Sequence, residues 1–161
     1  ADLPDLDFVL TPVGGGGLLS GSALSGKYYS PSTKIIGCEP ELACDAFESF
    51  QSGTLQPAKN PVTIADGLRT ALGDINFRYI KKHVYDILLC SENEIVEAQK
   101  LIWQRMKIVI EPSSAVPVAC LLKYKEHFSN TRVGVIISGG NVDVRSFFDD
   151  LIQGIESKTQ G

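Results

Sequence analysis

Histidine is scarce in this chain, and its cysteines are widely spaced. The two histidines, His83 and His127, lie in the charged stretches KKHVYD and KYKEHF, so we expect them at the surface. A catalytic triad built on histidine therefore has little to draw on. No CxxC pair is present, which argues against a zinc site or a disulfide framework. We expect free, buried thiols and a reducing, cytoplasmic location. The cysteines are Cys38, Cys44, Cys90 and Cys120.

The sequence also lacks a basic stretch and a long apolar run. Its formal net charge is -4 at pH 7 and no stripe of Lys and Arg is present. A nucleic-acid partner is therefore not expected. No apolar run approaches the roughly 20 residues that cross a membrane. The acidic start ADLPDLD has no signal-peptide pattern, so we expect no membrane partner either.

What the sequence does contain is an alternation of short apolar runs and longer helical patterns. The apolar runs are rich in Val and Ile, as in strands buried on both faces of a parallel sheet. This order predicts an α/β fold: a three-layer αβα domain, spanning residues 1–161, around an open, mainly parallel twisted sheet. Predicted strands cover 7–13, 34–39, 85–90 and 132–138. Predicted helices cover 18–29, 43–52, 77–82, 91–106, 111–124 and 144–155, with a short helix near 67–71.

Four consecutive glycines, Gly14, Gly15, Gly16 and Gly17, separate the first predicted strand from the first predicted helix. Such a loop presents several backbone N–H groups at a helix N-terminus, where their partial positive charge favours an anion such as phosphate. The stretch matches neither GxGxxG nor the Walker pattern GxxxxGK[ST], so an NTPase is disfavoured. A flexible or tightly packed turn is the alternative explanation.

A second pair of glycines follows the last predicted strand, in IISGGNVD. In a parallel sheet Ser138 would lie at the same edge as the first glycine loop, where open α/β sheets bind ligands. The stretch is not GxSxG, and no histidine is placed to activate the serine, so a hydrolase is disfavoured. We interpret Ser138 as a hydrogen-bond partner for a ligand.

Five stretches taken together resemble a known family. PVGGGGLLSG, GCEPELACD, TIADGLR, RMKIVIEPSSAV and IISGGNVD occur in this order between about Leu6 and Asp143. They resemble the fold-type II (tryptophan-synthase-β-like) pyridoxal-phosphate enzymes. Within that group the chain is similar to the branch of serine racemases and of serine/threonine and 3-hydroxyaspartate dehydratases.

The resemblance implies a cofactor site. In the family, the glycine loop holds the cofactor phosphate, and the residue matching Ser138 hydrogen-bonds the pyridine nitrogen. A hydroxyl does not hold that nitrogen protonated as an aspartate would, so the ring is a weaker electron sink. Glu111 matches a residue that faces the cofactor, with a plain helix-start carboxylate before Pro112 as the alternative. The implied cofactor-binding residues are Gly14, Gly15, Gly16, Gly17, Leu18, Glu111 and Ser138.

The resemblance also implies a divalent-cation site. Glu39, Ala43 and Asp45 match its ligands, and two carboxylates with a backbone carbonyl are hard oxygen ligands suited to Mg²⁺, Ca²⁺ or Mn²⁺. The alternative is that Glu39 merely ends a strand, while Asp45 is solvated in a first helical turn.

Two further positions match a nucleotide effector site of the family, for which ATP would be the ligand. They are Lys107 and Asn141, and a solvated surface lysine is the alternative for Lys107. Asp66 and Gly67 of IADG are expected to fix the loop over the cofactor, with a plain turn as the alternative.

The family's Schiff-base lysine lies in a motif that these 161 residues do not contain. We therefore expect the chain to be the C-terminal half of a longer, homodimeric enzyme that needs its N-terminal half, with no catalytic residue here and no activity alone. The resemblance implies racemisation, or β-elimination to a keto acid and ammonia, of serine- or threonine-like amino acids. The alternative is a non-catalytic α/β module that binds a small phosphate-bearing molecule.

Overall fold

Four strands in the described part of the chain form one parallel sheet. The computed structural model describes residues 5–143 and 145. The strands are β1 (Phe8–Pro12), β2 (Lys34–Pro40), β3 (Asp86–Cys90) and β4 (Val133–Val135), in the order β3-β2-β1-β4. Every neighbouring pair is parallel, which confirms the predicted sheet type. The strands carry few exposed residues because helices cover both faces.

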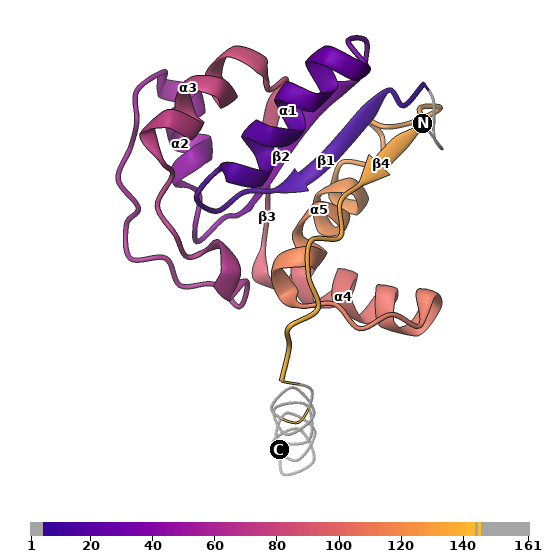
Figure 1. The fold of residues 1–161 in the computed structure, drawn as a ribbon. Helices are drawn as coiled ribbons and strands as arrows, with labels where there is room; N and C mark the ends of the chain where they lie inside the picture. The colour runs from indigo at the N-terminus through magenta and orange to yellow at the C-terminus, as the bar shows by residue number, and fades with distance from the viewer. Residues whose placement is uncertain (1–4, 144, 146–161) are drawn as a thin grey trace.

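Helices pack on both faces of this sheet, and the fold is the predicted three-layer αβα arrangement (Figure 1). On one face lie α1 (Gly17–Tyr29), α2 (Asp45–Ser52) and α3 (Asp74–His83). Their buried side chains form a cluster with the sheet around Leu19 and Ile80. On the other face lie α4 (Glu92–Met106) and α5 (Pro112–Lys123), whose cluster contains Ile95 and Val116.

Local sequence accounts well for the start of α4. Ser91 Oγ accepts from the N–H of Glu94, and the Glu94 carboxylate accepts from the N–H of Ser91. This is the capping box that the stretch SENE predicts, and it satisfies two N–H groups at this helix terminus. Pro112 opens α5 at a position where the missing N–H costs no intrahelical bond.

Three elements differ from the sequence-based prediction by three residues at one end, and the others differ by at most two. Helix α3 begins at Asp74 rather than at residue 77, and a 3-10 turn, η1 (Asp66–Leu68), replaces the short helix predicted at 67–71. Strand β4 ends at Val135, because beyond Ile136 the chain leaves β1 and turns toward α5. The helix predicted at 144–155 lies outside the described residues.

The thiols and imidazoles follow the sequence-based prediction in part. Cys38, Cys90 and Cys120 are buried and free, whereas Cys44 is only half-buried. His127 is exposed as predicted, but His83 is partly buried because its ring stacks on Tyr79 one turn earlier in α3. In the part of the chain that the structure describes, no helix has the length and apolar character needed to cross a membrane.

Candidate functional site

The two glycine stretches lie side by side at one edge of the sheet. Strands β1 and β4 are parallel neighbours, with Phe8 paired to Val133 and Leu10 paired to Val135. The glycine loop follows the carboxyl end of β1, and the segment with Ser138 follows the carboxyl end of β4. This is the edge at which open α/β sheets bind ligands.

A cavity of about 290 Å³ lies between these two stretches. The end of β1, the start of α1 and the turn η1 all contribute residues to the wall of this cavity. The structure brings every residue predicted to bind a cofactor to this one cavity. Its lining consists of Pro12, Gly14, Gly15, Gly16, Gly17, Leu18, Gly67, Leu68, Glu111, Ser113 and Ser138.

The glycine loop is tightly packed on its outer side. Gly16 has φ +84°, a left-handed conformation that side chains with a Cβ rarely adopt. A Cβ at this position would also lie 2.6 Å from Leu72 Cδ1 and 2.9 Å from Asn76 Cβ. Both the backbone conformation and the close packing therefore require glycine at position 16.

One carbonyl group of the glycine loop is anchored by α3 and the residue before it. The carbonyl oxygen of Gly15 accepts from Asn76 Nδ2 at 2.6 Å and from the N–H of Gly73 at 3.2 Å, so it is held on the side of α3. Within the described residues, the N–H groups of residues 14–18 have no protein acceptor. Helix α1 begins at Gly17 with no acidic residue in its first turn. Unpaired amides at a helix N-terminus favour a bound anion.

Ser138 lines the same cavity as the start of α1. Its side chain is exposed, and its Oγ is 3.1 Å from Ser114 Oγ. Ser114, on the first turn of α5, is fully buried and also contacts both the N–H and the carbonyl of Gly139. Ser138 thus lines the cavity, and its hydroxyl contacts a buried serine.

Glu111 precedes α5 and holds the turn after Ser138. Its N–H donates to the carbonyl of Gly139 at 3.2 Å, and its Oε2 accepts from the N–H of Asn141 at 3.0 Å. A Cβ on Gly139 would lie 2.8 Å from Glu111 Oε1. The carboxylate therefore packs on this turn and makes no side-chain cap for α5, unlike a simple helix-start carboxylate.

The turn η1 closes the cavity between these walls. The N–H of Gly67 donates to Asp66 Oδ1 at 2.9 Å and to Ser113 Oγ at 3.1 Å. A Cβ on Gly14 would lie 3.1 Å from the carbonyl oxygen of Gly67. The segment IADG is thus fastened to both the glycine loop and α5, which is more than a plain surface turn requires.

The predicted cation ligands lie at the end of β2. Glu39 is almost fully buried, and its carboxylate accepts from the N–H groups of Ala46 at 3.2 Å and Phe47 at 2.7 Å. Burial raises the pKa of Glu39 to about 8, the Phe47 N–H lowers it, and the charge of Asp45 raises it further. Glu39 is therefore a buried carboxyl group that is easily protonated when no cation is nearby.

Asp45 and Ala43 are also buried at this point of the fold. Asp45 Oδ2 accepts from the N–H of Leu72 at 2.8 Å, so Asp45 is not solvated as the alternative explanation required. Among the described residues, no three side chains of His, Cys, Asp or Glu are clustered as metal ligands. The set predicted from the sequence has only two carboxylates, with the carbonyl of Ala43 as its third oxygen.

Lys107 and Asn141 lie on two adjacent exposed segments. Lys107 follows α4 in a left-handed conformation with φ 60°. A Cβ on Gly140 would lie 2.8 Å from the carbonyl oxygen of Val109, so the chain after α4 runs beside the chain after Ser138. Lys107 is exposed and follows the helix terminus rather than lying within a helix.

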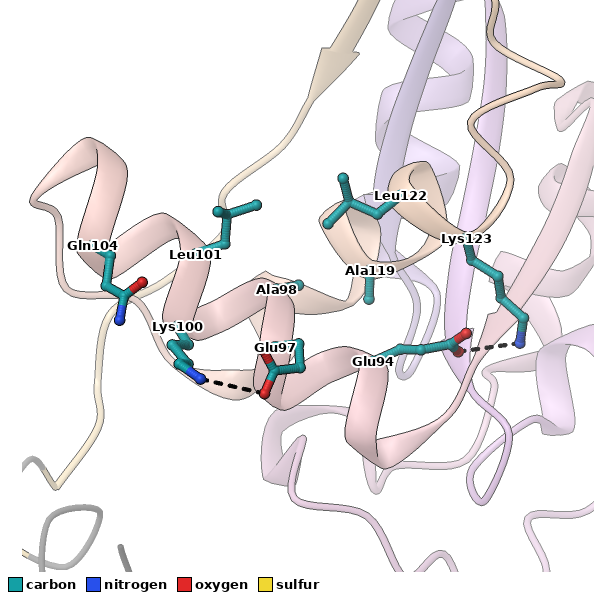
Figure 2. A pocket seen from close by; sticks show the side chains of 9 residues that line it. All are labelled: Glu94, Glu97, Ala98, Lys100, Leu101, Gln104, Ala119, Leu122 and Lys123. Atoms are coloured by element: carbon teal, nitrogen blue, oxygen red, sulfur yellow. Dashed lines mark ion pairs between the residues drawn. The ribbon is translucent and has the colours of Figure 1, made fainter.

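A separate hollow of about 280 Å³ lies between α4 and α5, away from the glycine loop (Figure 2). Lys123 lines this hollow and pairs with Glu94 at 3.2 Å and with Glu41 at 2.8 Å; burial lowers the pKa of Lys123, but these two carboxylates raise it above its usual value. Apolar side chains of Leu101 and Leu122 line the same hollow. None of the predicted site residues contributes to it.

Sequence reasoning missed three side chains that shape the cavity: Asn76, Ser113 and Ser114. Asn76 is 61 residues from Gly15, and no local pattern connects them. The stretch EPSSA did carry a signal, because Ser113 and Ser114 are both buried in the first turn of a helix. Buried serines need hydrogen-bond partners, which here lie on η1 and on the turn after Ser138.

Comparison with known proteins identifies relatives of this arrangement. A family profile described as "Pyridoxal-phosphate dependent enzyme" matches residues 1–139. The chain is 49% identical over 139 residues to a beta-hydroxyaspartate dehydratase of Paracoccus denitrificans, covering 86% of this chain and 44% of that protein. It is 44% identical over 156 residues to an L-threo-3-hydroxyaspartate ammonia-lyase of Saccharomyces cerevisiae, covering 96% of this chain and 48% of that protein.

A solved structure is similar as well. The crystal structure of serine racemase from Dictyostelium discoideum superposes with a TM-score of 0.82 at 47% identity, covering 88% of this chain and 46% of that one. The chain therefore spans somewhat less than half the length of each of these three proteins.

Proposed function

Because the chain belongs to the family of pyridoxal-phosphate dependent enzymes, we propose that its 290 Å³ cavity binds pyridoxal phosphate. The phosphate would bind the N–H groups of the glycine loop and Leu18, and the ring nitrogen would bind Ser138. The observation that carries this proposal is a single cavity lined both by the glycine loop, whose backbone amides have no protein acceptor among the described residues, and by the exposed Ser138.

The residues present fit the chemistry of the cofactor. Amides without acceptors at the start of α1 suit a phosphate dianion, since the helix dipole adds to their partial charges. When bound, pyridoxal phosphate would supply an electron sink for negative charge that develops on the carbon bearing the substrate's amino group. The Ser138 hydroxyl would orient the ring and donate to an uncharged ring nitrogen. Glu111 would fix the turn that carries this hydroxyl.

We further propose that the complete enzyme acts on serine- or threonine-like β-hydroxy amino acids, by racemisation, by β-elimination to a keto acid and ammonia, or by both. Support comes from the relatives, which are named as hydroxyaspartate dehydratase, hydroxyaspartate ammonia-lyase and serine racemase. The lysine that would bind the cofactor covalently is assigned to a part of the enzyme other than residues 1–161.

A divalent cation is proposed for the second site. Glu39, Asp45 and the carbonyl of Ala43 would bind Mg²⁺, Ca²⁺ or Mn²⁺, with water completing the shell. Burial of both carboxylates, with hydrogen bonds only from backbone N–H groups, supports this proposal, because a cation would offset their mutual repulsion.

The remaining assignments concern the assembled enzyme. We propose that residues 1–161 act as one α/β unit of a cytoplasmic homodimer, and that Lys107 and Asn141 contact a nucleotide effector such as ATP. The closeness of the segments after α4 and after Ser138 supports the effector assignment. Sedimentation of the purified enzyme with and without ATP would test the dimer and the effector together.

Calorimetry of the intact protein, freed of cofactor, tests the cofactor proposal. Pyridoxal phosphate should bind at least tenfold more tightly than inorganic phosphate, and Ser138→Ala should weaken only the former. Equal affinity for pyridoxal phosphate, ATP and inorganic phosphate would favour the non-catalytic anion-binding module instead. Assays with L-serine, L-threonine and 3-hydroxyaspartate, which follow keto acid and enantiomer separately, test the reaction.

A further inference from the structure

Ser114 is the buried residue that controls the surroundings of the Ser138 hydroxyl. Its side chain is fully buried on the first turn of α5. Ser114 Oγ accepts from the N–H of Gly139 at 2.7 Å, donates to the carbonyl oxygen of Gly139 at 2.8 Å, and lies 3.1 Å from Ser138 Oγ. One hydroxyl therefore has three polar neighbours but only one proton to donate.

That single proton can take two directions. When Ser114 donates to the Gly139 carbonyl, as it does in this structure, the hydrogen bond between the two serines requires Ser138 to donate to Ser114, and the Ser138 proton is then not available to the cavity. If Ser114 instead donates to Ser138 Oγ, the proton of Ser138 is available to a group inside the cavity. The direction of the Ser114 hydroxyl thus decides whether Ser138 presents a donor or an acceptor.

The second direction leaves no buried group without a partner. The Gly139 carbonyl also accepts from the N–H of Glu111 at 3.2 Å, so it keeps a hydrogen bond when Ser114 turns away. The Gly139 N–H continues to donate to Ser114 in both cases. Switching between the two directions therefore avoids the cost of an unsatisfied buried carbonyl. Donation from Ser114 also polarises the Ser138 hydroxyl and makes it a stronger donor.

We propose that Ser114 is a positioning residue that turns the Ser138 hydroxyl toward the cavity as a donor to an uncharged ring nitrogen. This inference rests on the proposed function. It assigns to Ser114 a role that acts only through Ser138 and therefore affects ligands with a ring nitrogen but not a phosphate alone.

The test measures two ligands on the intact protein freed of cofactor. Pyridoxine phosphate has the ring nitrogen and the phosphate but no aldehyde, so it binds without a covalent bond, while inorganic phosphate lacks the ring. Ser114→Ala is expected to lower the affinity for pyridoxine phosphate by about tenfold, the effect of one hydrogen bond. The affinity for inorganic phosphate should change by less than about twofold. Ser114→Ala/Ser138→Ala should match Ser138→Ala alone, since coupled residues are not additive.

Two outcomes overturn the proposal. Ser114 has only a structural role if Ser114→Ala lowers the affinity for both ligands equally. The same conclusion follows if its loss of affinity for pyridoxine phosphate adds fully to that of Ser138→Ala. The matched control is Ser91→Ala, which removes a serine hydroxyl from the start of α4 and should leave both affinities unchanged. Should Ser114→Ala not fold, Ser114→Cys replaces the hydroxyl with a thiol, a slightly larger group and a weaker donor. This variant is expected to lose affinity for pyridoxine phosphate but not for inorganic phosphate.

Nitrogen NMR of pyridoxine phosphate labelled at the ring nitrogen gives an independent reading. An uncharged, hydrogen-bonded nitrogen in the wild-type protein supports the proposal, and a protonated nitrogen contradicts it. If the wild-type protein does not bind pyridoxine phosphate at all, the proposed function fails and this inference fails with it. Binding without a ring-specific effect of Ser114 overturns only the inference.

Discussion

Asn76 Nδ2 donates a 2.6 Å hydrogen bond to the carbonyl oxygen of Gly15, across a separation of 61 residues. The same side chain accepts from Ser20 Oγ at 3.2 Å, so Asn76 joins α3 to both the glycine loop and α1. Because a trans peptide directs its N–H opposite to its C=O, holding the Gly15 carbonyl on the side of α3 directs the N–H of Gly16 away from α3. The proposed phosphate site would thus depend on a residue that does not line the cavity.

Asn76→Ala should therefore weaken phosphate binding without removing any group that contacts the ligand. We expect affinity for inorganic phosphate to fall by about tenfold, and the free energy of unfolding to fall by about 1 kcal/mol, as for one lost hydrogen bond. Calorimetry and denaturant unfolding measure the two quantities. Asn93→Ala, at an exposed position of α4, is the matched control. Unchanged phosphate affinity in Asn76→Ala would show that phosphate binding does not depend on the hydrogen bond from Asn76 to the Gly15 carbonyl.

Two glycines near the same loop should respond oppositely to alanine. Gly16→Ala introduces a Cβ at positive φ and within 2.6 Å of Leu72, which should lower the free energy of unfolding by about 2–4 kcal/mol. Gly21→Ala lies within α1, where a Cβ meets nothing within 4 Å, and should raise it by about 0.5–1 kcal/mol. Denaturant unfolding of both variants measures the sign of each change in the free energy of unfolding. Equal changes in the two variants would contradict the tight packing described for Gly16.

The Glu39 carboxyl should make stability depend on pH. Its pKa is raised from 4.5 to about 8 by burial, so the folded protein binds more protons than the unfolded chain in this interval. With a chelator present, its contribution to stability is complete below pH 4.5 and is lost as the pH rises to about 8. Glu39→Gln should lack this loss, whose slope is at most about 1.4 kcal/mol per pH unit. Identical pH profiles of the two proteins would refute the assignment.

A divalent cation should reverse this effect of pH. At pH 8 and after removal of chelator, Mg²⁺, Ca²⁺ or Mn²⁺ should raise the unfolding midpoint of the wild-type protein, because a cation favours the charged form of Glu39. The rise of the unfolding midpoint caused by the cation should be at least tenfold smaller in Glu39→Gln. Glu97→Gln, an exposed carboxylate beside Lys100 on α4, is the control and should respond as the wild type does (Figure 2). Equal stabilisation of all three proteins would indicate cation binding elsewhere.

How much could be predicted from the sequence differs between elements. The strands and α4 could be predicted because their signals are local: apolar runs for the sheet, and Ser91 with Glu94 for the helix start. The start of α3 could not, because Asp74 and Asn76 are weak helix formers and Asn76 is held by the glycine loop. Strand β4 is shorter than its apolar run, because Ser114 and Glu111 draw the chain away after Ile136.

The candidate site shows the same division. The glycine loop and Ser138 were identifiable as strand ends with small residues, and the parallel sheet brings them together at one cavity. Asn76 and Ser114 act on them through contacts made only in the folded chain. Patterns in a sequence indicate which groups can meet a ligand, but the side chains that orient those groups follow from packing.

A crystal structure of the intact protein with pyridoxal phosphate tests the central claim most directly. We predict the phosphate within hydrogen-bond distance of the N–H groups of residues 14–18, and the ring nitrogen within hydrogen-bond distance of Ser138 Oγ. A phosphate bound away from the glycine loop, or a ring nitrogen facing a group other than Ser138, would contradict the account.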